Sequence, residues 1–247
     1  MRNGSLPGDS EHAGIEVWIL QLRSMEKGLN NYTATISEAE RVRAARFVRA
    51  IDRERFIVAH AALREILSIY CERSAGALEF QFNLHGKPGL RDFPQIAFNL
   101  SHSGQLALVA VARGVGRLGV DVEEVRSDAL NEGVAERFFS PGELERLKSL
   151  DGQERALGFF RCWTRKEAYL KAIGCGISDE DLATVEVTLR REEEPEIVRG
   201  VASENTSNWK VFHLEPRPGF IAAVVAENVA GVLRVRNWHG RPYPCKS

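Results

Sequence analysis

Two acidic residues, Asp121 and Glu123, stand two positions apart in the segment LGVDVEE. Because side chains of a strand alternate between its faces, these carboxylates share one face, while Leu118, Val120 and Val122 share the other. Like charges on one strand face are tolerated in water, but in a cleft they are costly unless a cation lies between them. Taken alone, the pattern is more typical of a strand with one solvated acidic face.

A third carboxylate, Glu167, falls inside an apolar pattern of helical period. We expect a helix over residues 153–173, and its projection places Glu167 in the middle of one apolar stripe. That stripe consists of Ala156, Phe160, Trp163 and Leu170. A buried carboxylate must be protonated, paired or bound to a metal. Lys171, one turn later, offers the simpler alternative of an i, i+4 ion pair.

Three carboxylates together favour a hard divalent cation. Mg²⁺ binds one or more carboxylates, keeps several waters and completes its shell with phosphate oxygens of a substrate. The sequence has no cluster of Cys and His residues that would indicate zinc. The residues themselves therefore predict Mg²⁺ and a phosphorylated substrate, and no more than that.

The elements that must position these residues follow from periodicity, capping and turn signals. Strands are expected at 16–22, 78–84, 96–101, 105–112, 120–125, 185–190, 209–214 and 220–226. Helices are expected from Ser37, from near Asp52, and at 134–139, 141–149 and 153–173. A short turn at residues 102–104 is expected to join two of the strands. The final segment, 237–247, is polar and contains prolines, and it is left unassigned.

The order of strand, helices and strands recurs along the chain and suggests an internal duplication. EVWILQL resembles WKVFHL, and LALVAVA resembles FIAAVVA, although such short apolar matches also arise by coincidence. A duplication predicts an α+β fold of two similar halves, 1–118 and 119–247, with the metal ligands in the second. A cleft between two halves is a favoured ligand site.

Composition excludes several classes of function. The 247 residues carry 33 basic and 34 acidic side chains, a net charge of −1, so extensive binding to nucleic acid or to an anionic membrane is not expected. The four cysteines show no CxxC spacing, which favours reduced thiols. Neither a signal peptide nor an apolar run of about 18 residues is found. We therefore expect a soluble, cytoplasmic protein.

Five segments, in this order, resemble the Sfp-type 4′-phosphopantetheinyl transferases. They are GKP at 86–88, FNLSHS at 98–103, GVDVE at 119–123, RFFSPGE at 137–143 and WTRKEAYLKAIGCG at 163–176. The resemblance covers roughly residues 37–177, and the combination of GVDVE with W-x-x-K-E-A-x-x-K is its most specific part. It implies a monomer of two similar α+β halves in a pseudo-twofold arrangement. It also implies coenzyme A in the cleft and transfer to a serine of an apo acyl or peptidyl carrier protein.

The resemblance also assigns roles at the carboxylates. Asp121, Glu123 and Glu167 correspond to magnesium ligands, with the ion bridging the pyrophosphate of coenzyme A. Glu167 is the candidate base for the carrier serine, directly or through a water, and a metal-bound hydroxide is the alternative. Lys171 would neutralise charge growing on the pyrophosphate as adenosine 3′,5′-bisphosphate leaves.

Further side chains correspond to contacts with coenzyme A. They are Arg43, Arg55, Lys87, Ser101, His102, Lys166 and Lys171. For His102 the alternative is a hydrogen-bonded turn histidine, and for Lys87 and Lys166 it is an ordinary solvated lysine. Glu40 stands where some relatives carry a lysine, so it is assigned no such contact. Glu143 fits a capping box with Ser140, and we interpret it as structural despite its functional counterpart in the family.

Two other functions use the same residues. A Mg²⁺-dependent hydrolase would cleave coenzyme A or another pyrophosphate with water as the acceptor. A non-catalytic relative would bind coenzyme A or carrier proteins, although a mere binder needs no set of metal ligands. Release of adenosine bisphosphate without an acceptor protein would indicate the first, and binding of coenzyme A that ignores Mg²⁺ would indicate the second.

Overall fold

The computed structural model describes residues 14–22, 29–126, 132–174, 182–201 and 204–240, and it shows one succession of elements twice. The first comprises β1 (Ile15–Gln21), α1 (Leu29–Thr35), α2 (Glu38–Ala45), α3 (Ala50–Cys71), β2 (Phe80–Phe82), β3 (Pro88–Leu90), β4 (Ile96–Ser103) and β5 (Leu106–Arg113). The second comprises β6 (Leu118–Glu124), α4 (Glu132–Phe138), α5 (Pro141–Lys148), α6 (Gly152–Ile173), β7 (Glu186–Val187), β8 (Ile197–Arg199), β9 (Trp209–Leu214) and β10 (Phe220–Glu227). A last strand, β11 (Leu233–Asn237), follows.

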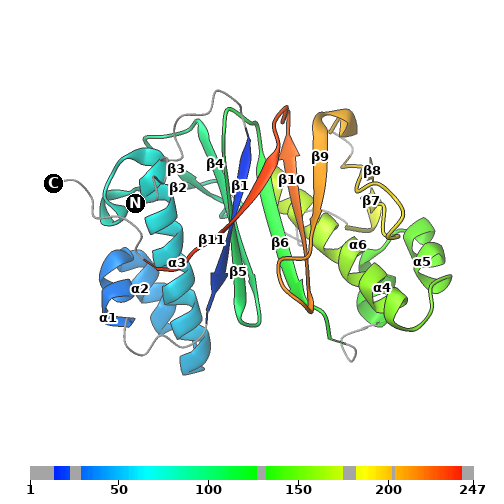
Figure 1. Cartoon of the computed structure of the whole chain (residues 1–247), viewed down its shortest axis with the longest axis horizontal. Coiled ribbons are helices and arrows are strands. Elements are labelled where there is room, and N and C mark those ends of the chain that lie inside the picture. The colour runs from blue at the N-terminus through cyan, green and yellow to red at the C-terminus, as the bar shows by residue number, and fades with distance from the viewer. Residues whose placement is uncertain (1–13, 23–28, 127–131, 175–181, 202–203, 241–247) are drawn as a thin grey trace, which may run out of the picture.

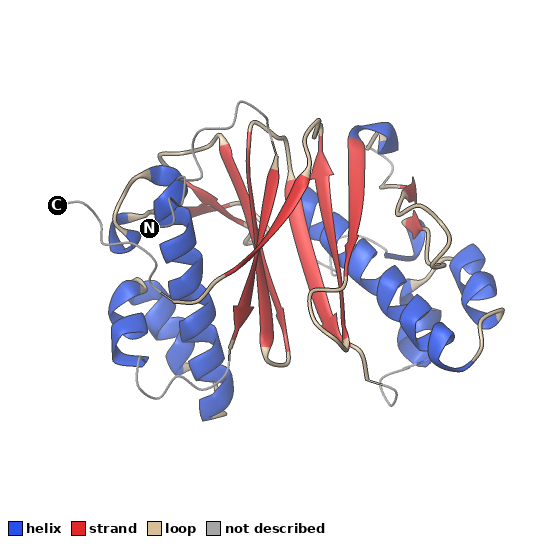
Figure 2. Cartoon of the chain, in the orientation of Figure 1, coloured by secondary structure: helices blue, strands red, loops and turns tan. Residues whose placement is uncertain are grey.

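Each succession builds an antiparallel sheet with the same strand order. The first sheet contains β1-β5-β4 and the second contains β6-β10-β9. The strand β11 returns from the end of the chain and pairs in parallel with β1, so the sheet of the first half includes a C-terminal strand. The fold is therefore α+β, with two sheets side by side and helices on the outer side of each (Figure 1, Figure 2).

This topology corrects one match made from the sequence. LALVAVA and FIAAVVA do occupy equivalent places, since β5 and β10 are the central strands of their triplets. EVWILQL in β1 corresponds to β6 in the strand order, whereas WKVFHL forms β9, the counterpart of β4. The wrong pairing arose because both segments are short and apolar, so their composition carries little positional information.

The inner faces of the two sheets pack against each other. Leu118, Val120 and Val122 of β6 belong to this middle core, together with side chains from β1, β5 and β10. The alternation predicted for LGVDVEE is thereby confirmed, because the apolar face of β6 turns towards the other sheet. Asp121 and Glu123 consequently lie on the opposite face, which is the face that packs against α6.

A 22-residue helix covers the outer side of each sheet, α3 in the first half and α6 in the second (Figure 2). The helix α6 ends at Ile173 and is capped by Gly174, whose φ of 83° suits a residue without a side chain. Both predicted capping boxes are present, Ser37 with Glu40 before α2 and Ser140 with Glu143 before α5. Within the described ranges, no helix is long and apolar enough to cross a membrane.

Several boundaries differ from those expected. The strand β4 continues to Ser103, so the residues expected in a turn at 102–104 begin at the end of a strand. Part of the GKPGL turn forms the short strand β3, and VEVTLR contributes only the two residues of β7. The helix α1 and the strands β8 and β11 were not predicted, because each is short or has no clear period.

Candidate active site

A glycine sets the distance between β6 and α6. A Cβ atom at Gly119 would lie 2.0 Å from the carbonyl oxygen of Ala168 and 2.5 Å from the amide nitrogen of Ala172. Only glycine permits this approach, so the strand lies directly against the helix. Asp121 and Glu123 from β6 are thereby brought towards Glu167 and Lys171 of α6.

The strands β4 and β6 meet at a seam between the two sheets. Side chains form the hydrogen bonds across this seam, instead of a ladder of backbone hydrogen bonds. The side-chain oxygen of Asn99 accepts a hydrogen bond from the amide of Val120 at 2.9 Å. Two positions on, Ser101 donates to Oδ1 of Asp121 at 2.8 Å. Two positions further, Ser103 donates to Oε2 of Glu123 at 2.8 Å. Alternate residues of β4 therefore orient the carboxylates of β6.

Asp121 is the most enclosed carboxylate of the group, with 3% of its surface exposed. Its Oδ1 accepts from Ser101 and also from the ammonium of Lys171, at 2.5 Å. Its Oδ2 is buried and has no hydrogen-bond partner among the described residues. A buried carboxylate oxygen without a partner is costly, and a ligand bound at this atom would offset that cost.

Glu167 resembles Asp121 in having one carboxylate oxygen that lacks a partner among the described residues. Its Oε1 is also buried without a hydrogen-bond partner in the described part of the chain. Burial, followed by the negative charge of Asp121, raises the pKa of Glu167 to about 7, against the opposing charge of Lys171. Burial and then Asp121 likewise raise the pKa of Glu123, although Ser103 and Trp163 hydrogen-bond it. The three carboxylates thus lie close enough to repel one another.

The surroundings of Glu167 differ from the sequence prediction. The helix α6 is buried on most of its circumference, including Arg165 and Lys166, and Glu167 lies on its half-buried line between Trp163 and Lys171. The i, i+4 ion pair with Lys171 does not form, because that ammonium pairs with Asp121 instead. Although burial acts against it, the carboxylate of Asp121 raises the pKa of Lys171, which keeps it positively charged.

His102 lies in a positively charged neighbourhood beside the carboxylates. Its pKa is lowered first by desolvation and then by the nearby charges of Lys171, His60 and Arg55. Of the two arginines expected to bind phosphates, Arg55 has its Nε buried without a partner among the described residues. Arg43 lies over the ring of Phe56, 5.4 Å from its centroid. Ser101, His102, Arg55 and Lys171 are therefore brought to one region that suits an anion.

Lys166 is placed differently from the sequence expectation. The side chain is 0% exposed, and its ammonium pairs with Glu143 at 2.5 Å. It also donates to the carbonyl oxygens of Phe138 and Leu182, at 2.8 and 3.0 Å. All three donors of the ammonium therefore have acceptors inside the protein, and none is presented to a ligand.

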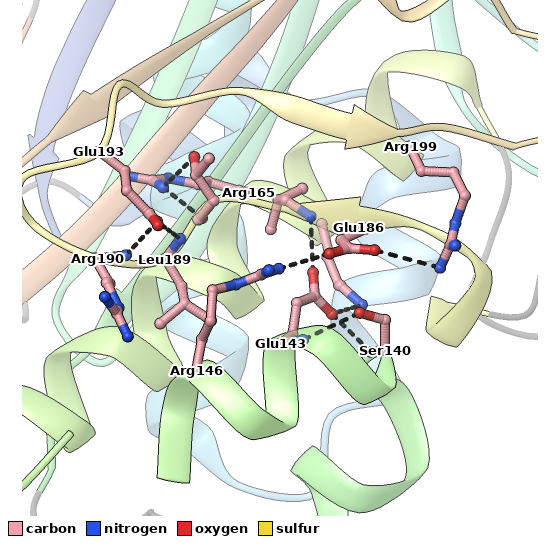
Figure 3. Close-up of polar contacts among 12 residues, drawn as sticks. Ser140, Glu143, Arg146, Arg165, Glu186, Leu189, Arg190, Glu193 and Arg199 are labelled. Carbon is pink, nitrogen blue, oxygen red and sulfur yellow. Dashed lines mark hydrogen bonds and ion pairs between the residues drawn. The ribbon is translucent and has the colours of Figure 1, made fainter. Parts of the chain in front are cut away.

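Both carboxylate oxygens of Glu143 accept hydrogen bonds within the protein (Figure 3). Its Oε2 accepts from the amide of Ser140 at 2.7 Å and its Oε1 accepts from the amide of Val187 at 2.8 Å. Nearby, Arg146 donates to Glu186 at 2.7 Å. The capping box predicted for Glu143 is confirmed, and the structure adds the ion pair with Lys166.

Lys87 and Glu40 also have partners inside the protein. The ammonium of Lys87 donates to the carbonyl oxygens of Ala172 and Leu118, at 2.7 and 3.0 Å. The carboxylate of Glu40 binds Arg64 at 2.7 Å and Nδ1 of His60 at 3.0 Å. These contacts help to hold the pKa of Glu40 at about 2 although burial would raise it.

Asn99, Ser103 and His60 are parts of the site that residue patterns alone did not identify. Asn99 and Ser103 lie within the FNLSHS segment, and their spacing of two from Ser101 on a strand was the available signal. His60 lies on α3, and nothing in its local sequence indicates that the fold places it near His102.

The arrangement can act on a phosphorylated ligand. Oxygen ligands with unsatisfied lone pairs suit a hard cation, and the adjacent cations suit phosphate groups. Among the described residues, no three His, Cys, Asp or Glu side chains already stand at the spacing of a metal-binding cluster.

Comparison with known proteins identifies the class. A family model described as the 4′-phosphopantetheinyl transferase superfamily matches residues 117–225, and one described as 4′-phosphopantetheinyl transferase, N-terminal, matches residues 22–113. The transferase HetI of Nostoc sp. is 37% identical over 229 residues, covering 91% of this chain and 92% of that protein. The chain therefore belongs to the 4′-phosphopantetheinyl transferase family and is an enzyme of that class.

Two further matches have a narrower extent. The 4′-phosphopantetheinyl transferase Sfp of Bacillus subtilis is 29% identical over 147 residues, covering 60% of this chain and 64% of that protein. A solved holo-(acyl-carrier-protein) synthase from Bacillus anthracis, in complex with CoA, covers 47% of this chain at 24% identity, with a TM-score of 0.35.

Proposed function

We propose that the protein transfers the 4′-phosphopantetheine group of coenzyme A to a serine of an apo acyl or peptidyl carrier protein, in a Mg²⁺-dependent reaction. Family membership supplies the reaction class. The observation that carries the metal dependence is a pair of buried oxygens, Oδ2 of Asp121 and Oε1 of Glu167, which have no hydrogen-bond partner among the residues that the structure describes. An enzyme that did not bind a cation there would leave both desolvated atoms uncompensated.

The residues present fit magnesium. Asp121, Glu123 and Glu167 offer oxygen ligands only, which Mg²⁺ prefers. The pKa of Glu167 is raised first by burial and then by the other two carboxylates, and a divalent cation would relieve their mutual repulsion. When bound, the ion would withdraw charge from the phosphoryl group under attack and from the departing oxygen. Ser101 and Ser103 would hold two of the three carboxylates in orientation.

Lys171 is proposed to contact the pyrophosphate. Its ammonium is half-buried and paired on one side with Asp121, so it is fixed in direction before a substrate arrives. A positioned cation of this kind strengthens its contact as negative charge develops in the transition state. His102, Arg55, Arg43 and Ser101 are proposed to contact the remaining phosphates of coenzyme A.

The carrier serine needs a base, and Glu167 is the proposed acceptor of its proton, directly or through a water. The bond from the serine oxygen to the phosphorus next to the pantetheine arm forms as the bond to the departing nucleotide oxygen breaks. Adenosine 3′,5′-bisphosphate then leaves.

An intact-mass assay tests this function. The enzyme, coenzyme A, Mg²⁺ and a panel of apo carrier proteins are expected to give carriers heavier by one phosphopantetheine group, and chelation of the metal should abolish the gain. No gain with any carrier, combined with release of adenosine bisphosphate to water, would replace the transferase with the hydrolase. Binding of coenzyme A without either product would indicate a non-catalytic relative.

We also propose that the enzyme works as a monomer in the cytoplasm. One chain supplies both β4 and β6, so both sides of the seam are present without a second subunit. Cys71 and Cys162 are buried free thiols, which suits a reducing compartment. Light scattering of the purified enzyme at assay concentration tests the first statement.

A further inference from the structure

The β2–β3 hairpin of the first half contacts the end of α6 in the second half. Asn83 donates from Nδ2 to the carbonyl oxygen of Gly174 at 3.2 Å. Lys87 donates to the carbonyl oxygen of Ala172 at 2.7 Å and to that of Leu118, the first residue of β6, at 3.0 Å. One hairpin therefore contacts both elements that carry the carboxylates.

The side chain of Asn83 also organises the hairpin. Its Oδ1 accepts from the amide of His85 at 2.9 Å and from that of Lys87 at 2.8 Å. The amide of Asn83 donates to the carbonyl of Lys87 at 3.0 Å, and Gly86 occupies the left-handed position, with φ at 82°. This arrangement directs the side chain of Lys87 towards α6.

The acceptors lie where a helix most needs partners. The last four carbonyl groups of α6 have no amide donor within the helix, and they form the negative end of its dipole. The amide of Gly174 donates to the carbonyl oxygen of Leu170 at 2.9 Å, and the ammonium of Lys87 donates to the carbonyl oxygen of Ala172. Contact is close, since a Cβ at Gly174 would lie 2.7 Å from Nδ2 of Asn83.

Lys171 lies within this turn. Its neighbours in sequence, Leu170 and Ala172, are the two residues whose carbonyls are held, and its own ammonium reaches Asp121 and Ser101. Movement of the turn would therefore move the Lys171 ammonium relative to the carboxylates. No carboxylate pairs with Lys87 within the described residues, so its contacts with the two carbonyls define its position.

We propose that Asn83 and Lys87 are positioning residues, which hold the last turn of α6 against β6 and thereby fix Lys171 beside Asp121. In this account Lys87 acts through the helix, and it does not bind the phosphates of coenzyme A as the family resemblance implied. The kinetic part of the inference rests on the proposed transferase function.

The test compares N83A and K87M with L84A, a control at a fully exposed residue of the same hairpin. For each variant, kcat and KM are measured with coenzyme A and again with 3′-dephospho-coenzyme A. The rate of hydrogen exchange of the Gly174 amide is measured in the free enzyme. We expect N83A and K87M to lower kcat about 10-fold or more, because small displacements of catalytic groups have effects of this size. The KM for coenzyme A and the preference over the dephospho form should stay as in L84A.

Hydrogen exchange at the Gly174 amide should be faster in both variants than in L84A. The fold-loss in kcat of the double variant should be smaller than the product of the fold-losses of the two single variants. Suppose that K87M raises the KM for coenzyme A but not the KM for the dephospho form, while N83A has the same kcat and KM as L84A. That result would show that Lys87 binds a phosphate, and it would overturn the proposal. Unchanged exchange in N83A would also overturn it, and this readout remains if K87M fails to fold. Because exchange needs no substrate, failure of the transferase function would not be mistaken for failure of this inference.

Discussion

Two clusters of charged residues include side chains of α6. The first consists of Glu143 and Lys166, and the second consists of Asp121, Glu123, Glu167 and Lys171. They differ in how completely their carboxylate oxygens are hydrogen-bonded within the protein. Glu143 has both oxygens hydrogen-bonded and is paired with Lys166, whose donors are all used within the protein. Asp121 and Glu167 each keep one buried oxygen without a partner in the described chain. Lys166 and Glu167 are therefore adjacent on one helix but differ in their partners, since Lys166 is fully paired within the protein and Glu167, among the described residues, is not.

This difference is the basis on which we propose to distinguish structural from ligand-binding buried charges. A structural pair must satisfy itself, because nothing else will compensate its desolvation. A functional group is left incomplete, since its partner is the ligand, and the cost is offset elsewhere in the fold.

The largest effect is expected from Glu167→Gln. The change keeps the shape of the side chain but removes a charged ligand and the proposed base, so holo-carrier formation should fall by about 10³-fold. The thermal midpoint should not fall, because one of three repelling charges is gone. Intact-mass kinetics and a thermal melt measure the two results. An active variant would mean that Glu167 belongs with the structural cluster.

Glu143→Gln should show the reverse pattern. The buried ammonium of Lys166 would lose its counterion, and stability should fall by about 3 kcal/mol or more. The folded fraction should keep near wild-type kcat. Urea unfolding and transfer kinetics test this expectation, and Glu143→Gln/Lys166→Met, which removes both charges, should recover much of the stability. A stable but inactive Glu143→Gln would place this carboxylate in the catalytic site.

Gly119→Ala tests the close spacing between β6 and α6, which brings Asp121 and Glu123 towards Glu167 and Lys171. The added methyl group would meet the backbone of Ala168 at 2.0 Å, so strand and helix must separate. We expect a loss of about 1–3 kcal/mol in stability together with reduced kcat, because Asp121 moves away from Lys171. Val120→Ala, on the opposite face of β6, is the matched control and should lower stability without a comparable loss in kcat. Equal kcat in both variants would contradict the account.

The smallest effect concerns the pH dependence of Lys87. Burial, followed by the charge of Arg117, lowers its pKa from 10.5 to about 8. Between these values the unfolded chain holds a proton that the folded chain has released, so this group makes stability rise with pH. The stability of the wild type relative to K87M should therefore increase from pH 8 to pH 10, by up to about 1 kcal/mol after solvent screening. A falling difference would show that the ammonium is stabilised in the fold.

Much of the site could be predicted from local pattern. The period of two in LGVDVEE placed Asp121 and Glu123 on one face, and the capping boxes at Ser37 and Ser140 follow from short-range chemistry that the fold preserves. Glu167 was identified because a carboxylate among apolar residues requires an explanation.

The remainder depended on contacts between distant segments. The sequence offers Lys171 an ion-pair partner four residues away, but the fold supplies Asp121, 50 positions away. Lys166 and Lys87 look like ordinary surface lysines until their acceptors are brought to them from other elements. The return of β11 to β1 is likewise invisible to any local period.

The central claim is that Asp121, Glu123 and Glu167 hold one divalent cation together with coenzyme A. Titration of Mn²⁺, a paramagnetic substitute for Mg²⁺, into enzyme with coenzyme A measures this directly by electron paramagnetic resonance. The wild type and Glu143→Gln should bind one ion with the same affinity, and Glu167→Gln should bind it at least about 10-fold more weakly. Equal affinity in the wild type and Glu167→Gln would contradict the account.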